Sequence, residues 1–315
     1  MTRIGTSDLD VFPLNLGGNT FGWTSSPEES HAVLDAFAAG GGNFLDTADG
    51  YSSWVPGNSG GESETIIGEW MTARGNRDDI VVGTKVSQHP SFPGLSAANV
   101  AAAADASLAR LGTDRIDLYY AHFDDASVPL EETVGAFQDL VVTGKVRYVG
   151  VSNYSGERLE EWIAIAERNN YALPIALQPH YNLVHREPYE SEFAPIVAAH
   201  RLGVMPYFSL ASGFLTGKYR TEADLEGKAR GRGAGQYLDA RGLAVIGQLE
   251  SIAAERGISI PTTALAWLRA QPGIAAPIAS ARTPDQVGDL LAAASVDLTD
   301  DELSRLDAVS APARG

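Results

Sequence analysis

The sequence predicts an α/β fold, a (β/α)8 TIM barrel, and two observations support this prediction. Short apolar or β-branched segments recur along the 315 residues, and the first seven begin 27 to 38 residues apart, which is close to one strand–helix unit each. Amphipathic stretches lie between these segments. Near-continuous apolar strands that alternate with helices are typical of a parallel sheet covered on both faces. Eight such units favour a closed barrel over an open doubly wound sheet.

The strands and helices can be placed in order along the chain. The expected strands begin near Pro13, Asn43, Ile80, Leu118, Tyr148, Ala176, Gly203 and Ile274. The clearest amphipathic stretches, expected to be helices, are Glu28–Ala39, Ala97–Leu111, Glu131–Val142, Glu157–Asn169 and Leu243–Glu255. Arg3–Phe12 precedes the first strand and is expected to form a short hairpin that closes the barrel floor. Because no linker separates two cores, we expect a single domain over residues 1–315.

Two long irregular segments follow strands and are therefore expected at the C-terminal rim, where barrel enzymes keep their sites. Ser52–Gly61 is rich in glycine, serine and proline and follows the second expected strand. Gly213–Leu238 follows the seventh and contains the basic, glycine-rich sequence GKARGRGAGQYL. We interpret this second segment as a mobile lid loop, because its basic residues suit an anionic ligand.

Composition excludes several classes of function. Lys and Arg total 23 against 40 Asp and Glu, and the resulting charge of −17 argues against nucleic acids and anionic membranes as partners. The absence of cysteine excludes disulfides and thiolate catalysis. The N-terminus lacks a signal peptide and no apolar run approaches the ~20 residues of a membrane helix, so we expect a cytoplasmic protein. The histidines outside the strand ends form no spaced ligand set with carboxylates, so no metal is expected.

Four polar residues stand at or just after expected strand ends: Asp46, Tyr51, Lys85 and His122. A barrel would bring all four to one rim. A tyrosine phenol has a pKa of about 10, and a lysine beside it is expected to lower that pKa, while an aspartate keeps the lysine charged and oriented. A histidine nearby can orient a substrate oxygen. The group suits a carbonyl that gains a proton while its carbon takes a hydride, although each residue alone also fits a structural role.

Further motifs accompany these four residues in order along the chain. They are PLNLGGNTFG, NFLDTADGY, GTK, DRIDLYYAH, GKVRYVGVSNY, QPHYNLVHR, GFLTGKY and PIASARTPDQVGDLL. Over essentially the whole chain they resemble the aldo-keto reductase family. The sequence looks nearer to members that include bacterial sugar and aldehyde reductases and potassium-channel β subunits than to mammalian aldose reductase. The resemblance implies that Tyr51, Lys85, Asp46 and His122 are catalytic, with Tyr51 as the proton donor.

The resemblance also implies NADPH as the cofactor, although no GxGxxG fingerprint follows a strand; GRGAG at Gly231–Gly235 belongs to the lid. Ser152, Asn153 and Gln178 match the positions that hold the nicotinamide carboxamide. The other implied cofactor-binding residues are Gly18, Asn19, Asp46, Tyr207, Phe208, Ser209, Leu210, Ala211, Lys218, Ser280, Arg282, Gln286 and Asp289. Of these, Tyr207 would stack on the nicotinamide and Arg282 would meet the ribose phosphate.

Two departures from the family pattern and two alternative readings bear on this assignment. Phe208-Ser209 stands where many relatives have Ser-Pro, and Leu290 replaces the usual asparagine at the adenine end. Without the resemblance, Ser152 and Asn153 suit the cap of the next helix equally well. Arg282 also suits a solvated surface cation.

The expected partner is a small-molecule aldehyde or ketone, bound near Trp23, Tyr51, Trp54 and His122. The loops at His89, Phe92 and Phe123, together with the lid, would set the substrate's identity; Trp54 equally suits a residue that packs its loop on the scaffold. The leading hypothesis is an NADPH-dependent carbonyl reductase. A cofactor-binding regulatory module and a lyase or isomerase stay open, because a barrel does not determine a reaction. Monomer and homo-oligomer fit equally well.

Overall fold

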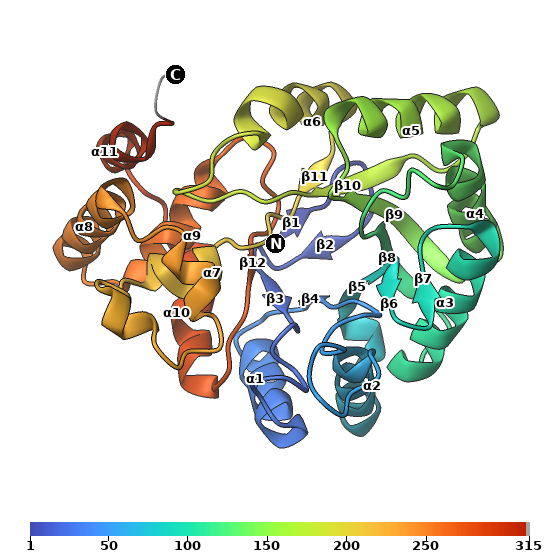
Figure 1. The fold of residues 1–315 in the computed structure, drawn as a ribbon, viewed down its shortest axis with the longest axis horizontal. Helices are drawn as coiled ribbons and strands as arrows, with labels where there is room; N and C mark the ends of the chain where they lie inside the picture. The colour runs from blue at the N-terminus through green and yellow to red at the C-terminus, as the bar shows by residue number, and fades with distance from the viewer. Residues whose placement is uncertain (313–315) are drawn as a thin grey trace.

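An eight-stranded parallel sheet forms the centre of the computed structural model, which describes residues 1–312 (Figure 1). Its strands, in chain order, are β3 (Asn15–Gly17), β4 (Phe44–Asp46), β5 (Val81–Val86), β8 (Ile116–Ala121), β9 (Val146–Ser152), β10 (Pro174–Gln178), β11 (Gly203–Val204) and β12 (Ile278–Ala279). The strand order is β11-β10-β9-β8-β5-β4-β3-β12, so consecutive strands of the barrel are neighbours in the sheet. The predicted (β/α)8 barrel is confirmed.

The barrel closes between β11 and the segment that leads into β12. Val204 N–H donates to Gly273 O at 3.0 Å, and Ala275 N–H donates back to Val204 O at 2.9 Å. The expectation that the eighth strand begins near Ile274 is therefore wrong in its boundary: β12 pairs with β3 only from Ile278. The physical reason is that this stretch first closes the barrel against β11 and then reaches Pro277, which has no N–H to give to a ladder.

Helices cover the outside of this sheet (Figure 1). They are α1 (Pro27–Ala39), α2 (Glu62–Arg74), α3 (Ala97–Leu111), α4 (Leu130–Val142), α5 (Gly156–Asn169), α6 (Ala194–His200), α8 (Ala240–Arg256), α9 (Ile260–Ala270), α10 (Val287–Ala292) and α11 (Asp300–Ser310). The five predicted helices all form, with ends within three residues of those expected. The helix α2 was not predicted, because it buries Ser63 and Glu64 together with Ile66 and Ile67 and so has no clean apolar face.

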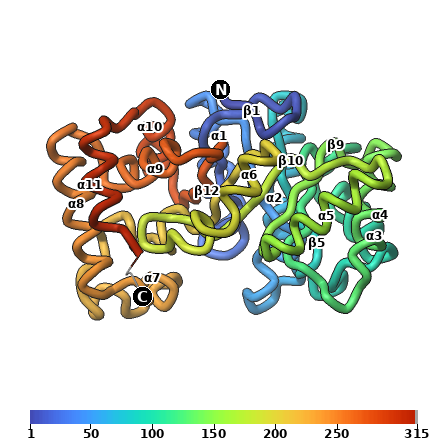
Figure 2. Tube along the Cα trace, turned by 90° about the horizontal axis from the view of Figure 1, so that it is seen from above, coloured from blue at the N-terminus to red at the C-terminus, as the bar shows by residue number. Residues whose placement is uncertain are grey.

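The predicted N-terminal hairpin forms from β1 (Thr2–Arg3) and β2 (Asp10–Val11), which pair antiparallel. Its buried side chains Ile4, Leu9 and Val11 pack in one cluster with residues of the barrel strands, among them Phe44 at the start of β4. Figure 2, which is turned by 90° from Figure 1, places this hairpin and the lid helix α7 (Gly231–Gly235) on opposite sides of the molecule. The hairpin therefore closes the N-terminal end of the barrel, and the C-terminal end is left for a site.

Candidate active site

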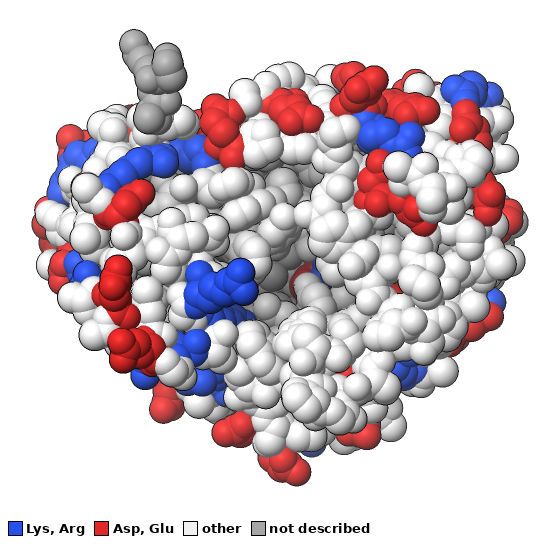
Figure 3. All heavy atoms as spheres, viewed as in Figure 1, with Lys and Arg blue, Asp and Glu red and all other residues white. Residues whose placement is uncertain are grey.

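A cavity of about 1610 Å³ opens at the C-terminal ends of the strands. The hollow in the centre of the face shown in Figure 3 marks its mouth. Residues at or just after seven of the eight strands line it: Gly17, Asp46, His122, Ser152, Gln178, Tyr207 and Ser280 are examples. This is the rim on which the polar residues of the strand ends were expected to meet.

The buried lysine of β5 holds three of the four predicted catalytic residues together. The Lys85 side chain is fully buried, and its Nζ donates to Asp46 Oδ2 at 2.7 Å, to Thr47 O at 2.7 Å and to Tyr51 Oη at 3.0 Å. Tyr51 Oη also lies 3.4 Å from Asp46 Oδ2. The pairing of β4 with β5 brings Asp46 beside Lys85, and the turn after β4 returns Tyr51 to the same point.

Burial and the neighbouring charge of Lys85 act on the pKa of Tyr51 in opposite directions. Burial raises the pKa of Tyr51 to about 12, and the opposing effect of Lys85 is smaller. Lys85 does lower this pKa, as expected, but the loss of solvent around the phenol outweighs that effect. Burial alone would lower the pKa of Lys85, but Asp46 and Tyr51 together raise it above its usual value. At neutral pH the site thus holds a protonated phenol beside a charged ammonium, which is the state a proton donor needs.

A pH profile tests this protonation state. Because the pKa of Tyr51 is raised, its proton is lost only as the pH approaches about 12. If Tyr51 is the proton donor, kcat for carbonyl reduction should not fall between about pH 7 and pH 9. Steady-state rates with saturating reduced cofactor and a non-ionising aldehyde measure this. A basic limb with a midpoint near neutrality would show that the phenol is far more acidic than the structure indicates.

His122 faces the phenol from the end of β8. The ring centroids of Tyr51 and His122 are 6.1 Å apart, and the imidazole lines the cavity. Burial, and then the charge of Lys85, hold the pKa of His122 well below its usual range. Its buried Nδ1 has no hydrogen-bond partner within residues 1–312. The histidine is therefore neutral, and it can hydrogen-bond a substrate oxygen placed between it and Tyr51.

A chain of hydrogen bonds runs from Asp46 to Tyr207. Gln178 Nε2 donates to Asp46 Oδ1 at 2.8 Å, and Ser152 Oγ donates to Gln178 O at 2.9 Å. Asn153 Nδ2 donates to Ser152 Oγ at 3.0 Å, and Tyr207 Oη donates to Asn153 Oδ1 at 2.8 Å. All five side chains line the cavity. The structure thus brings the expected nicotinamide-binding residues together, directly beside Asp46.

The alternative role for Ser152 and Asn153 as helix caps does not hold. The helix α5 begins at Gly156, and its cap is Ser155, whose hydroxyl accepts from Arg158 N–H. Asn153 instead adopts a left-handed conformation with φ of 54°, in the turn between β9 and α5. Both side chains are therefore left to line the cavity.

The segment after β11 winds around the next part of the cavity. Phe208, Ala211 and Ser212 adopt left-handed conformations with φ of 53°, 49° and 57°. A residue that precedes proline is held toward extended conformations, so serine at position 209 is compatible with the turn at Phe208. Ser209 and Leu210 line the cavity as expected, whereas Ala211 is buried away from it and only its backbone shapes the turn.

Basic side chains gather along this part of the cavity, beside the hollow in Figure 3. They are Lys218, Lys228, Arg230 and Arg282. Burial lowers the pKa of Lys218, and the charges of Arg230, Arg282 and Lys228 lower it further. Such crowding in a chain of net charge −17 is typical of an anion-binding site.

Sequence reasoning missed Arg230 as a cavity residue. Arg230 donates to Asn19 Oδ1 at 3.2 Å, and its guanidinium lies 5.8 Å from the ring centroid of Trp23. The one signal in the sequence was the basic run GKARGR, which does not say which of its cations turns inward. Gly18 does not line the cavity. Its N–H donates to Asp46 O at 2.8 Å, and this bond holds the end of β3 against the end of β4.

The expected adenine-end residues lie together at the far end of the cavity. Ser280 Oγ donates to Asn19 Oδ1 at 2.7 Å, and Gln286 Oε1 accepts from Arg282 N–H at 2.8 Å. Asp289 and Leu290 complete this end. Arg282 is exposed, and no carboxylate within the described residues forms an ion pair with it, so its guanidinium is available to a ligand.

Aromatic residues form the opposite, apolar wall near Tyr51. Trp54 is 52% exposed and lines the cavity together with Phe123, so it does not merely pack its loop. Trp23 supports Trp54 edge-on at 5.6 Å between centroids but does not itself line the cavity. His89 and Phe92, which were expected near the substrate, instead pack against each other at 5.1 Å and do not line it.

The expected lid over Gly213–Leu238 contains short helices, so its description as an irregular loop is wrong. They include α7, formed by GRGAG, and a 3₁₀ turn at Glu222–Leu225. Glycine suits the first position of α7 because a Cβ on Gly231 would lie 2.3 Å from Leu225 O. Local propensity argues against a glycine-rich helix, and packing overrides it here.

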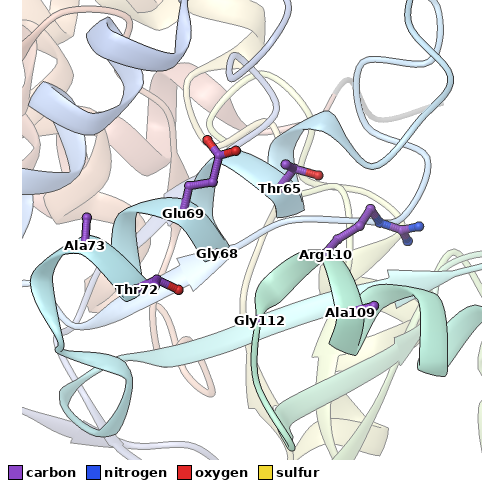
Figure 4. A pocket seen from close by; sticks show the side chains of 8 residues that line it. All are labelled: Thr65, Gly68, Glu69, Thr72, Ala73, Ala109, Arg110 and Gly112. Atoms are coloured by element: carbon purple, nitrogen blue, oxygen red, sulfur yellow. The ribbon is translucent and has the colours of Figure 1, made fainter.

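A second, shallow pocket of about 660 Å³ lies between α2 and α3 (Figure 4). Arg110, its one basic residue, already pairs with the buried Glu64 at 2.7 Å.

Within residues 1–312 no three His, Asp or Glu side chains are grouped so that they could hold a metal ion. None of the helices described is long and apolar enough to cross a membrane.

A barrel with a buried Lys–Asp pair and a protonated tyrosine at its rim fits the oxidoreductases that act on carbonyl groups. The chain belongs to the Aldo/keto reductase family, whose sequence model matches residues 13–311. It is 34% identical to a probable voltage-gated potassium channel subunit beta of Oryza sativa subsp. japonica, over 98% of this chain and 95% of that protein. Its identity to norsolorinic acid reductase B of Aspergillus parasiticus is 31%, over 96% and 81%. Its identity to protein tas of Escherichia coli (strain K12) is 30%, over 98% and 96%.

Family membership, together with relatives named as oxidoreductases or reductases, supports an oxidoreductase that acts on a small carbonyl compound. Members of this family generally use NAD(P)H. Other relatives are named as voltage-gated potassium channel subunits.

Proposed function

We propose that the protein reduces an aldehyde or ketone to an alcohol with NADPH, with Tyr51 as the proton donor. The observation that carries the proposal is the 3.0 Å contact between Tyr51 Oη and the buried Lys85 ammonium, at a cavity that His122 also lines. When bound, the reduced nicotinamide supplies a hydride to the carbonyl carbon. Tyr51 gives its proton to the carbonyl oxygen, and Lys85 stabilises the phenolate that is left. His122 orients the oxygen, and Asp46 holds Lys85 in place.

The chemistry of the cavity supports a dinucleotide. At one end, amide and hydroxyl groups of Ser152, Asn153 and Gln178 can bind a carboxamide beside the Tyr207 ring. Further along, Lys218 and Arg230 suit a pyrophosphate. At the far end, Arg282 and its neighbours suit a ribose phosphate and a base. The spacing of these groups along one cavity of about 1610 Å³ fits a long ligand with its charge in the middle and at one end.

Two measurements on the purified protein test the proposal. Oxidation of NADPH is followed by its absorbance across a panel of aldehydes and ketones, and cofactor binding by quenching of tryptophan fluorescence. We expect quenching and carbonyl-dependent oxidation. Quenching without oxidation of any panel member would favour a cofactor-binding regulatory module, which the name of the rice relative makes the second candidate. Conversion of a substrate without any nucleotide would favour a lyase or isomerase.

Replacing Arg282 with alanine tests the preference for NADPH over NADH. The two cofactors differ in the 2′-phosphate, and a charged hydrogen bond contributes about 10- to 150-fold in affinity. We expect Arg282→Ala to weaken NADPH by about that factor, less so at high salt, and to change NADH little. Fluorescence titrations with both cofactors measure this.

Arg3→Ala is the matched control, since it removes one exposed cation from the floor of the barrel. The two variants therefore have the same net charge. Equal losses for NADPH and NADH would assign Arg282 to adenine or to the loop. A wild-type preference for NADH would refute the proposed preference for NADPH. It would not affect the proposed role of Tyr51 as the proton donor.

We further propose one domain over the chain, although residues 313–315 lie outside the part that the structure describes, and a cytoplasmic location. Limited proteolysis followed by mass spectrometry tests the first: a single domain yields no two stable fragments. Fractionation of the source cells tests the second.

A further inference from the structure

A group of stacked aromatic rings supports Tyr207 from outside the cavity. His180 stacks on Tyr207 with centroids 5.3 Å apart and planes 23° apart, and it stacks on His185 at 3.7 Å and 11°. Neither histidine lines the cavity, whereas Tyr207 does. One side of the Tyr207 ring is therefore covered by His180, and a nicotinamide must approach from the cavity side.

The hydrogen bonds around His180 define which of its nitrogens carries the proton. Asn182 Nδ2 donates to Phe208 O at 2.9 Å and Asn182 Oδ1 accepts from Val184 N–H at 2.9 Å, so the orientation of this amide is determined. The same Nδ2 faces His180 Nε2 at 3.4 Å, so Nε2 must present a lone pair. Burial, and then His185, lower the pKa of His180 to about 3, in agreement with a neutral ring.

Since Nε2 is an acceptor, the tyrosine that contacts it is the donor. Tyr237 Oη lies 3.2 Å from His180 Nε2. Tyr237 belongs to the lid: it follows α7, which begins directly after the cavity residue Arg230. Its ring is 9% exposed and packs near Phe214 at 6.0 Å between centroids. The C-terminal end of the lid is thus attached to the ring that supports Tyr207.

We propose that His180 and Tyr237 are positioning residues, and that their hydrogen bond couples closure of the lid to the orientation of Tyr207. This inference rests on the proposed function, in which the nicotinamide lies against Tyr207. Neither residue touches the substrate or the reacting atoms. A bound cofactor that orders the lid through Arg230 also holds the Tyr237 hydroxyl on His180, and the stack transmits this constraint to the Tyr207 ring.

The first test is a double-mutant cycle on NADPH affinity. Tyr237→Phe removes only the hydroxyl, and His180→Phe removes the acceptor while keeping an aromatic ring. Each is expected to weaken NADPH by about 2- to 12-fold, the contribution of one neutral hydrogen bond. The double variant should lose no more than either single one, because both remove the same bond. The control is Tyr148→Phe, which removes a hydroxyl that donates to Asp8 at the floor of the barrel.

A second readout separates positioning from a general loss of structure. His180→Ala removes the ring and should weaken NADPH but leave the affinity for 2′,5′-ADP, which lacks the nicotinamide, unchanged. With NADPH bound, trypsin should cut near Lys228 and Arg230 faster in Tyr237→Phe than in the wild type. If His180→Ala fails to fold by circular dichroism, His180→Phe takes its place in the comparison of NADPH with 2′,5′-ADP.

Several results would overturn the inference. These are additive effects in the cycle, equal losses of NADPH and 2′,5′-ADP affinity in His180→Ala, or a Tyr237→Phe variant indistinguishable from Tyr148→Phe. A wild-type protein that binds no nicotinamide nucleotide would instead refute the proposed function, so the two failures are distinguishable.

Discussion

Tyr51→Phe is expected to reduce kcat by about 10²–10⁴-fold while the affinity for NADPH stays near that of the wild type. The change removes one oxygen atom, and the phenyl ring keeps its packing between Trp54 and His122. Lys85 keeps two of its three acceptors, Asp46 and Thr47, so the fold is expected to persist. Steady-state kinetics and fluorescence titration of the same preparation measure both quantities.

Tyr148→Phe serves again as the control for loss of one hydroxyl, and it should keep full activity. Wild-type kcat in Tyr51→Phe would remove this residue from the role of proton donor. A parallel loss of NADPH affinity would instead show that the variant disturbs the cofactor end of the cavity.

Lys85→Met is expected to have the larger effect, because it changes both catalysis and stability. The phenolate formed at Tyr51 would lose its neighbouring charge, so kcat should fall at least as far as in Tyr51→Phe. Asp46 is 2% exposed and would lose the ammonium that lies 2.7 Å away. Removing one partner of a buried ion pair costs about 3–5 kcal/mol of unfolding free energy. Urea unfolding and steady-state kinetics measure the two effects.

The double variant Asp46→Asn, Lys85→Met separates the two effects. It removes the uncompensated carboxylate, so stability should recover in large part while kcat stays low. Lys145→Met is the matched control, since it removes an exposed lysine that pairs with Asp105. Full stability in Lys85→Met would show that the buried ion pair with Asp46 does not stabilise the fold. Full activity would show that Lys85 does not stabilise the phenolate of Tyr51.

The strands, five of the helices and the candidate catalytic residues could be predicted because their signals are local. Apolar segments such as that beginning at Ile80 need no knowledge of their neighbours to be recognised as strands. Once eight strands are parallel, Asp46, Lys85 and His122 must share one rim, because all three stand at strand ends. The position of these residues at strand ends was therefore enough to predict that they meet in one site, and the resemblance to a family added the cofactor.

By itself, the sequence determined the barrel, its hairpin floor and which side chains stand at the rim. Only the tertiary structure decided that burial outweighs Lys85 in setting the pKa of Tyr51, and that Arg230 turns into the cavity. It also decided that Trp23 supports Trp54 from behind and that His180 contacts a lid tyrosine. Each of these depends on the desolvation of a group, or on contacts between segments far apart in the chain. No pattern within a short window records either quantity, because both arise only when the barrel closes.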